Sequence, residues 1–213
     1  MDLSGNDIND AGIRSVAFSG TMTRLHTLRI ERNPIGDAGI AAMVESTLLR
    51  RMLARCPHLD LRANAIGPVG ADVLAGCPDL ALVAGLDLDK NYLGDRGVVA
   101  LAGSGRLTSL RTLRLSRNQV TDSAAFALAP ALANLPKLRS LDLSGNRLSW
   151  RGVGALRAVA LPRWITLDVS GNGTEPDGPF AVADLVAGIL HNVADAEVAE
   201  LRRRIAHPIR REG

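Results

Sequence analysis

Residues 28–40 have the sequence LRIERNPIGDAGI, and this stretch decides the fold because its pattern recurs along the chain. Leu28 and Ile30 lie two residues apart, so in an extended segment both side chains point to the same side. Asn33 follows this apolar pair and Ile35 comes two residues later. A glycine six residues after the asparagine opens an apolar stretch with helical spacing. The stretch therefore predicts a short strand, a turn at the asparagine, and a helix.

Asparagines mark the equivalent positions of seven units and are separated by 27, 31, 27, 27, 28 and 26 residues: Asn6, Asn33, Asn64, Asn91, Asn118, Asn146 and Asn172. Apolar residues stand five and three positions before each of them. One unit cannot bury both its strand face and its helix face alone, so neighbouring units must stack. We expect the asparagine amides to form a ladder that satisfies backbone groups of adjacent units, which is a structural role.

The predicted fold is an α/β solenoid of about seven repeats over residues 1–180. It is expected to be a horseshoe with parallel strands on the concave face and helices on the convex face, because helices are wider than the strand spacing. The long spacing from Asn33 to Asn64 predicts an extra turn or a local bulge on the helical side near residues 48–54. Residues 181–213 are predicted to form a C-terminal helical cap with a basic tail.

Aspartates precede four of the predicted helices, where a carboxylate can cap the first turn of its own helix. These residues are Asp10, Asp37, Asp95 and Asp122. Pro68 takes the same place in the third unit, where its missing N–H costs nothing. Cysteine–proline or leucine–proline pairs mark the ends of several helices, since proline cannot continue a helix.

The first repeat is truncated at its strand, because residues 1–6 (MDLSGN) match residues 141–146 (LDLSGN). We expect Leu3, Ile8 and Ile13 to form an exposed apolar end. Two explanations are consistent with such an exposed end. Either the chain self-associates through its uncapped N-terminal repeat, or it is the C-terminal recognition fragment of a larger regulatory or effector protein.

Charge and composition argue against several classes of function. The formal net charge is +3, and residues 201–213 carry +4, which leaves −1 for residues 1–200. Lysine and arginine are therefore not spread over one face, and no nucleic-acid partner is expected. No apolar run has membrane-spanning length and no secretory signal follows Met1, which predicts a cytoplasmic protein without a membrane partner. Cys56 and Cys77 are expected to be buried, reduced thiols.

Catalytic motifs are absent from the sequence. There is no phosphate-binding loop, no GxGxxG segment opening a helix, no HExxH and no GxSxG. The four histidines are scattered, although His58 and His26 could reach the edges of strands. Asp60, Asp87 and Asp89 alternate with arginines, which makes them poor ligands for a metal ion. We therefore predict no enzymatic activity, no cofactor and no metal.

The stretch from Leu28 to Ile40, and likewise residues 86–98, resembles the ribonuclease-inhibitor-like class of leucine-rich repeats. The resemblance covers about residues 1–180. It implies a horseshoe that binds a macromolecular partner, usually on the concave face. Family analogy also raises the regulation of a GTPase by an inserted arginine, but no loop arginine of this chain matches such a motif.

The variable outward positions of the strands, four, two and one before each asparagine, give the candidate binding site. Units two to five carry a mixed-charge field there, and an aromatic residue lies beside it. The predicted partner-binding residues are Arg29, Glu31, Arg32, Asp60, Arg62, Asp87, Asp89, Lys90, Tyr92, Arg114 and Arg117. The functional interpretation is a salt-sensitive docking surface for a protein partner. The alternative is that these charges only pair between adjacent strands and keep the face soluble.

Overall fold

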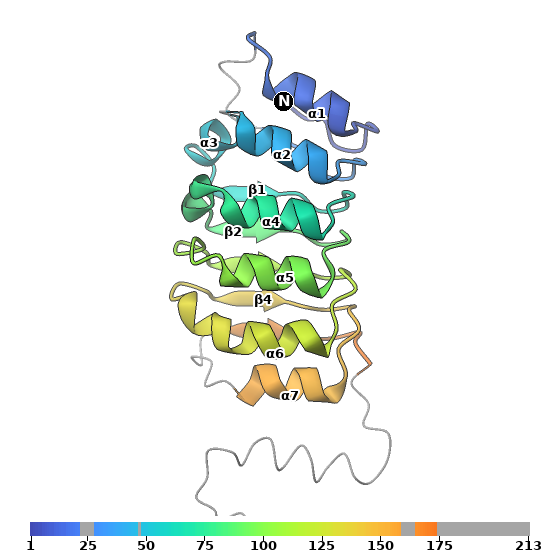
Figure 1. Ribbon diagram of the computed structural model, residues 1–213, viewed down its shortest axis with the longest axis vertical. Helices are drawn as coiled ribbons and strands as arrows, with labels where there is room; N and C mark the ends of the chain where they lie inside the picture. The colour runs from blue at the N-terminus through green and yellow to red at the C-terminus, as the bar shows by residue number, and fades with distance from the viewer. Residues whose placement is uncertain (22–27, 47, 159–164, 174–213) are drawn as a thin grey trace, which may run out of the picture. The chain divides into compact units, whose positions relative to one another are not determined.

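The computed structural model describes residues 1–21, 28–46, 48–158 and 165–173, which all belong to one unit, Met1–Thr174. Within this unit the helices lie side by side in one layer and the strands lie in a second layer behind them (Figure 1). The chain is therefore an α/β solenoid, as predicted. The predicted helical cap, residues 181–213, lies outside the described residues.

The sheet is parallel, and its strands follow one another in chain order. Each strand is three residues long: β1 (His58–Asp60), β2 (Gly85–Asp87), β3 (Thr112–Arg114), β4 (Ser140–Asp142) and β5 (Thr166–Asp168). The register pairs equivalent repeat positions, for example Leu59 with Leu86 and Leu86 with Leu113. Asp2 and Arg29 form an isolated parallel bridge, which continues the same register into the first two units.

The helices follow the strands at the predicted places. The long ones are α1 (Asp10–Ala17), α2 (Asp37–Glu45), α4 (Pro68–Gly76), α5 (Gly94–Gly103), α6 (Asp122–Ala131) and α7 (Trp150–Ala158). The extra helix α3 (Leu48–Leu53) confirms the extra turn in the longest unit, and four of its six residues are buried. Two 3₁₀ turns, η1 (Pro78–Leu82) and η2 (Leu132–Asn134), lead from helices back to strands and were not predicted.

The core is a continuous aliphatic layer between the strands and the helices. The residues five and three before each asparagine from Leu59 to Leu143 are at most 2% exposed. Helix residues such as Ile40, Leu74 and Leu128 close the layer from the other side. Because each unit repeats the same apolar positions, every internal layer is buried by its two neighbours.

The asparagine ladder is present as predicted. The Asn146 Oδ1 accepts from the N–H groups of Asn118 (2.8 Å) and Val120 (3.1 Å) in the preceding unit. Its Nδ2 donates to the carbonyls of Leu115 and Leu143, each at 2.9 Å. The five asparagines from Asn33 to Asn146 are buried, and their amides link backbone groups of two units. Asn6 is exposed, and within the described part of the chain its side-chain amide donates only to the Ser4 carbonyl.

The prediction that the four aspartates cap their own helices is wrong. Each carboxylate reaches the N-cap residue of the next helix: Asp10 accepts from the Gly36 N–H at 2.6 Å, and Asp37 accepts from the Gly67 N–H at 2.7 Å. Asp95 and Asp122 bind Thr121 and Ser149 in the same way. These side chains therefore brace neighbouring helices. In α1 the cap is instead supplied by Asn9, which accepts from Gly12.

Two burial predictions need correction. Ile13 is fully buried, because it packs against α2, and only Leu3 and Ile8 remain half-buried. Cys77 is buried as expected, but Cys56 is an exposed free thiol. No helix among the described residues has the length and apolar character needed to cross a membrane.

Candidate functional site

The strand face is formed by the residues four and two positions before each asparagine, whose side chains point away from the helices. The alternation of the strand places them there, because the residues between them are buried. In units two to five these positions hold Arg29, Glu31, Asp60, Arg62, Asp87, Asp89, Arg114 and Ser116. Seven of these eight residues belong to the predicted site.

Aspartate is the structural residue at the position four before the asparagine. Its Oδ1 accepts the N–H of the residue two places later, at 2.9 to 3.2 Å, in five of the seven units. The residues are Asp2, Asp60, Asp87, Asp142 and Asp168. This bond satisfies a backbone donor where the strand ends. The predicted site residues Asp60 and Asp87 thus have a structural task.

Arg29 and Arg114 replace this aspartate in units two and five. In unit five the backbone donor is satisfied from the neighbouring strand, because the Asp89 Oδ1 accepts the Ser116 N–H at 2.7 Å. The side chains of Arg29 and Arg114 remain 57% and 51% exposed. Both arginines therefore replace the usual aspartate and do not accept the backbone hydrogen bond that the aspartate accepts in the other units.

Ion pairs connect charges along the first three units. The Arg29 guanidinium lies 2.7 Å from Glu31 and 3.5 Å from Asp2. Arg62 lies 3.6 Å from Glu31 and 3.2 Å from Asp60. A separate pair joins Arg114 to Asp87 at 3.6 Å. Pairing between adjacent strands, the alternative weighed from the sequence, is therefore present for these three arginines.

Glu31 does not have the exposed position that was expected. It is 3% exposed, because the side chains of Arg29 and Arg62 meet over its carboxylate. Burial raises the pKa of this carboxyl, but the hydrogen bonds from its own backbone N–H and from Arg29 outweigh burial, so the net pKa is lowered. Glu31 therefore holds the two arginines in place and offers little surface to a partner.

Negative charge accumulates in the middle of the strand face. Burial and the neighbouring Asp87 carboxylate raise the pKa of Asp89 to about 6. Burial also raises the pKa of Asp60, with a further contribution from Asp87. Burial is the main cause of both raised pKa values, and the Asp87 carboxylate is the largest charge contribution to each, ahead of the opposing Arg62 or Arg114.

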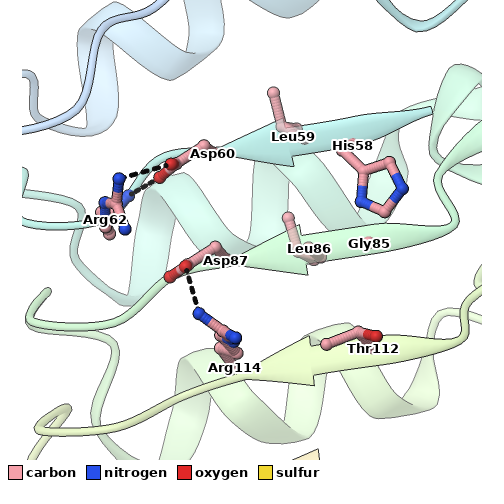
Figure 2. Close-up of a pocket in the computed structure, with 9 residues that line it drawn as sticks. All are labelled: His58, Leu59, Asp60, Arg62, Gly85, Leu86, Asp87, Thr112 and Arg114. Atoms are coloured by element: carbon pink, nitrogen blue, oxygen red, sulfur yellow. Dashed lines mark hydrogen bonds and ion pairs between the residues drawn. The ribbon is translucent and has the colours of Figure 1, made fainter. Parts of the chain in front are cut away.

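A shallow hollow of about 330 Å³ lies on the strand face over β1, β2 and β3 (Figure 2). Its lining residues are His58, Leu59, Asp60, Arg62, Gly85, Leu86, Asp87, Thr112 and Arg114. The His58 ring lies across Gly85 of the next strand, and a Cβ at Gly85 would collide with the ring. Figure 2 shows the Asp60–Arg62 and Asp87–Arg114 pairs at the opposite end of the hollow.

The position six before the asparagine was missed in the predicted site. His58, Gly85 and Thr112 occupy it and line the hollow together with four predicted residues. The signal was available, because the outward alternation of the strand extends two residues back from the position four before the asparagine. Gly85 is the residue that leaves space for the histidine ring.

The position directly before the asparagine has a left-handed backbone in all seven units. Glycine, which adopts this conformation without strain, occupies it as Gly5, Gly145 and Gly171, with φ between +63° and +65°. The other units have Arg32, Ala63, Lys90 and Arg117, with φ between +52° and +59°. A residue with a Cβ costs about 1 kcal/mol or more in this region relative to glycine.

The predicted residues Arg32, Lys90 and Arg117, called here the cationic row, are exposed. Their backbone N–H groups donate to the next unit at 2.8 to 3.0 Å, so the three side chains start from equivalent points. Within the described residues none of them takes part in an ion pair or a side-chain hydrogen bond. Tyr92, two residues after Lys90 in the sequence, is 59% exposed.

The described residues contain no group of three or more histidine, cysteine, aspartate or glutamate side chains that could hold a metal ion. The strand face combines surface charge with a shallow hollow. This arrangement can bind the surface of a polypeptide through ion pairs and hydrogen bonds.

Comparison with protein families found two matches. The family described as Leucine Rich repeats (2 copies) matches residues 108–152, and the family described as Leucine Rich repeat matches residues 1–17, 21–44, 58–75 and 86–102. Together these segments cover more than half of the chain. Comparison with curated proteins found no match.

Among solved structures, the chain is similar to the plant peptide hormone receptor RGFR1 in complex with RGF2. The sequences are 16% identical and the TM-score is 0.34. The similar region covers 76% of this chain and 26% of the receptor chain, so the chain spans about a quarter of the receptor's length.

Proposed function

Because this chain belongs to the leucine-rich-repeat proteins, we propose that it is a non-catalytic scaffold that binds a protein partner on its strand face. The repeating positions are occupied by the core, the asparagine ladder and the aspartate caps, so specificity must come from the positions that vary. The variable charges are concentrated on the strand face of units two to five.

The presence of arginine at positions 29 and 114 carries this proposal. Aspartate at that position makes a hydrogen bond that the strand end needs, and five units keep it. Arg29 and Arg114 do not make this hydrogen bond, and their side chains are more than half exposed. Exposed arginines are frequent energetic anchors of interfaces, and Arg114 lines the hollow. Pairing with Asp2, Glu31 and Asp87 orients these guanidiniums and still leaves donors for a partner.

The test restores the residue that the repeat prefers. In the Arg29→Asp/Arg114→Asp variant each aspartate can again accept the N–H two residues later. Arg62 is left unchanged, so that the buried Glu31 keeps one of its two arginine partners when Arg29 is removed. Folding of the variant is verified by circular dichroism before binding is measured. A control variant, Arg106→Asp/Lys137→Asp, makes the same change in net charge at exposed loop residues that precede strands.

Proteins retained by each immobilised variant from a lysate of the source cells would be identified and quantified at low and moderate salt. We expect a partner that the wild type and the control retain, that the strand-face variant loses, and whose retention weakens with salt. Equal retention by a correctly folded Arg29→Asp/Arg114→Asp variant would exclude the strand face as the binding surface.

A further inference from the structure

No structural role of Arg32, Lys90 and Arg117 explains why cationic residues occupy the cationic row. The left-handed backbone before each asparagine favours glycine, and the chain uses glycine there in units one, six and seven. Long cationic side chains stand at the same position in units two, four and five. They are exposed and, among the described residues, unpaired. The arginines of the strand face differ, because all three of them have carboxylate partners.

The row runs across the strands along one margin of the strand face. Lys90 and Arg117 belong to adjacent units, so their backbones lie about one strand spacing of 4.8 Å apart, and Arg32 lies two units beyond Lys90. The aliphatic part of Arg117 lies beside Gly145, where a Cβ would approach its Cγ to 2.9 Å. Glycine in unit six thus leaves space for the arginine of unit five.

We propose that the cationic row, with Tyr92, binds an extended acidic segment of the protein partner that runs across the units along this margin. The proposal rests on the proposed function and specifies the chemistry of the partner. Carboxylates of the segment pair with Arg32, Lys90 and Arg117, and the segment packs against the exposed Tyr92 ring.

The neighbouring strand face favours a polypeptide over a nucleic acid. Over the seven units, the positions four and two before the asparagines carry seven carboxylates and three guanidiniums. The Asp87 carboxylate also adds to the effect of burial in raising the pKa values of Asp60 and Asp89. A continuous polyphosphate would lie next to these carboxylates, whereas a peptide can present carboxylates at the row and neutral residues elsewhere.

The binding experiment uses the full chain and a fluorescein-labelled peptide of four Glu-Ala repeats, followed by fluorescence anisotropy in a low-salt buffer. A Gln-Ala peptide of the same length and a single-stranded oligothymidine are the comparison probes. The test variant is Arg32→Gly/Lys90→Gly/Arg117→Gly, which installs the residue that other units have at this position. A matched control, Arg55→Ser/Arg106→Ser/Lys137→Ser, removes the same charge from exposed loop residues.

We expect the wild type to prefer the Glu-Ala peptide over the Gln-Ala peptide, and the glycine variant to bind it about tenfold more weakly. The control should stay within twofold of the wild type. The melting temperature of the glycine variant should be unchanged or higher, because glycine relieves the left-handed strain. If that variant loses stability, Arg32→Asn/Lys90→Asn/Arg117→Asn replaces it, since asparagine tolerates this conformation.

Three results would overturn the proposal: no preference for the Glu-Ala peptide, equal binding by the wild type and a folded row variant, or tighter row-dependent binding of the oligothymidine. Such a failure is distinguishable from failure of the proposed function. Retention of a partner that depends on Arg29 and Arg114 would then remain, and only the acidic segment would be excluded.

Discussion

Single asparagines act differently according to the number of units they connect. Asn146 accepts from two backbone N–H groups of the preceding unit and is 7% exposed. Asn6 is exposed, and among the described residues its side-chain amide donates to the Ser4 carbonyl alone. An asparagine at this repeat position should therefore contribute more to the free energy of unfolding in an interior unit than in the first unit.

Replacement of these two asparagines by alanine should separate the two cases. Asn146→Ala leaves two buried donors unsatisfied, at about 1–3 kcal/mol each, so we expect a loss of roughly 2–5 kcal/mol in the free energy of unfolding. Asn6→Ala should lose less than about 1 kcal/mol, because water replaces its single bond. Urea denaturation followed by circular dichroism measures both. Similar losses for the two variants would contradict the ladder as a source of stability.

Asp89 gives the strand face a dependence of stability on pH. Its pKa rises from 3.8 to about 6 on folding, so the folded chain binds a proton more tightly than the unfolded chain. The stability contributed by this proton is present at low pH and is lost as the pH rises from about 4 to about 6. Asp89→Asn keeps an oxygen for the Ser116 N–H but carries no charge.

We therefore expect Asp89→Asn to be more stable than the wild type above pH 6, by about 1–2 kcal/mol after allowance for solvent screening. The advantage should shrink towards pH 4. Asp168→Asn is the control of opposite sign, because hydrogen bonds from Ser170 lower the pKa of Asp168. Urea titrations at several pH values between 4.5 and 8 measure both variants. A constant advantage of Asp89→Asn over this range would contradict the raised pKa.

At the scale of secondary-structure elements, the aspartates at the helix starts connect one helix to the next. Asp37, the first residue of α2, accepts the N–H of Gly67, the N-cap of α4. Pro68 stands at the equivalent place in α4, and α5 begins differently: Leu93 is its N-cap, Gly94 has φ +55°, and the Gly94 N–H donates to the Asn118 carbonyl. Where the aspartate is missing, the next helix starts with another geometry.

Removal of one such brace should destabilise the chain by the amount typical of a helix cap. We expect Asp37→Ala to lower the free energy of unfolding by about 1–2 kcal/mol, because the Gly67 N–H loses its acceptor. Asp72→Ala on α4 is the matched control. Asp72 makes only a 3.7 Å pair with Arg96, and its side chain is 56% exposed, so its loss should stay within about 0.5 kcal/mol. A larger effect for Asp72 than for Asp37 in thermal denaturation would contradict the brace.

The sequence predicts the elements well and the contacts between them less well. The apolar pair, the asparagine and the helical spacing recur with every unit, so strands, helices and ladder follow from the local pattern. The acceptor role of Asp37 does not follow, because its own helix and the next N-cap are equally plausible partners until the units are stacked. The burial of Glu31 was unpredictable for the same reason, since it depends on two arginines from different units. The strand alternation could have indicated the His58 position.

At the scale of the whole molecule, stability should depend on how many neighbours a unit has. Leu115 and Leu3 occupy the same repeat position, three before the asparagine. Leu115 is fully buried between two units, whereas Leu3 is half-buried. In a stacked array each unit is stabilised mainly by the interfaces with its nearest neighbours. The two leucines therefore report on an interior and a peripheral layer of one core.

Leu115→Ala creates a cavity between two interfaces, and we expect it to lower the free energy of unfolding by about 2–5 kcal/mol. Leu3→Ala removes side-chain atoms that are already partly in water, so its loss should be about 1 kcal/mol. Hydrogen exchange shows which helices lose stability in each variant. Leu115→Ala should reduce amide protection in α5 and α6 together, whereas Leu3→Ala should reduce amide protection in α1 and leave α5 unchanged. Equal and uniform losses of protection in the two variants would mean that the described units unfold as one body whose interfaces do not act separately.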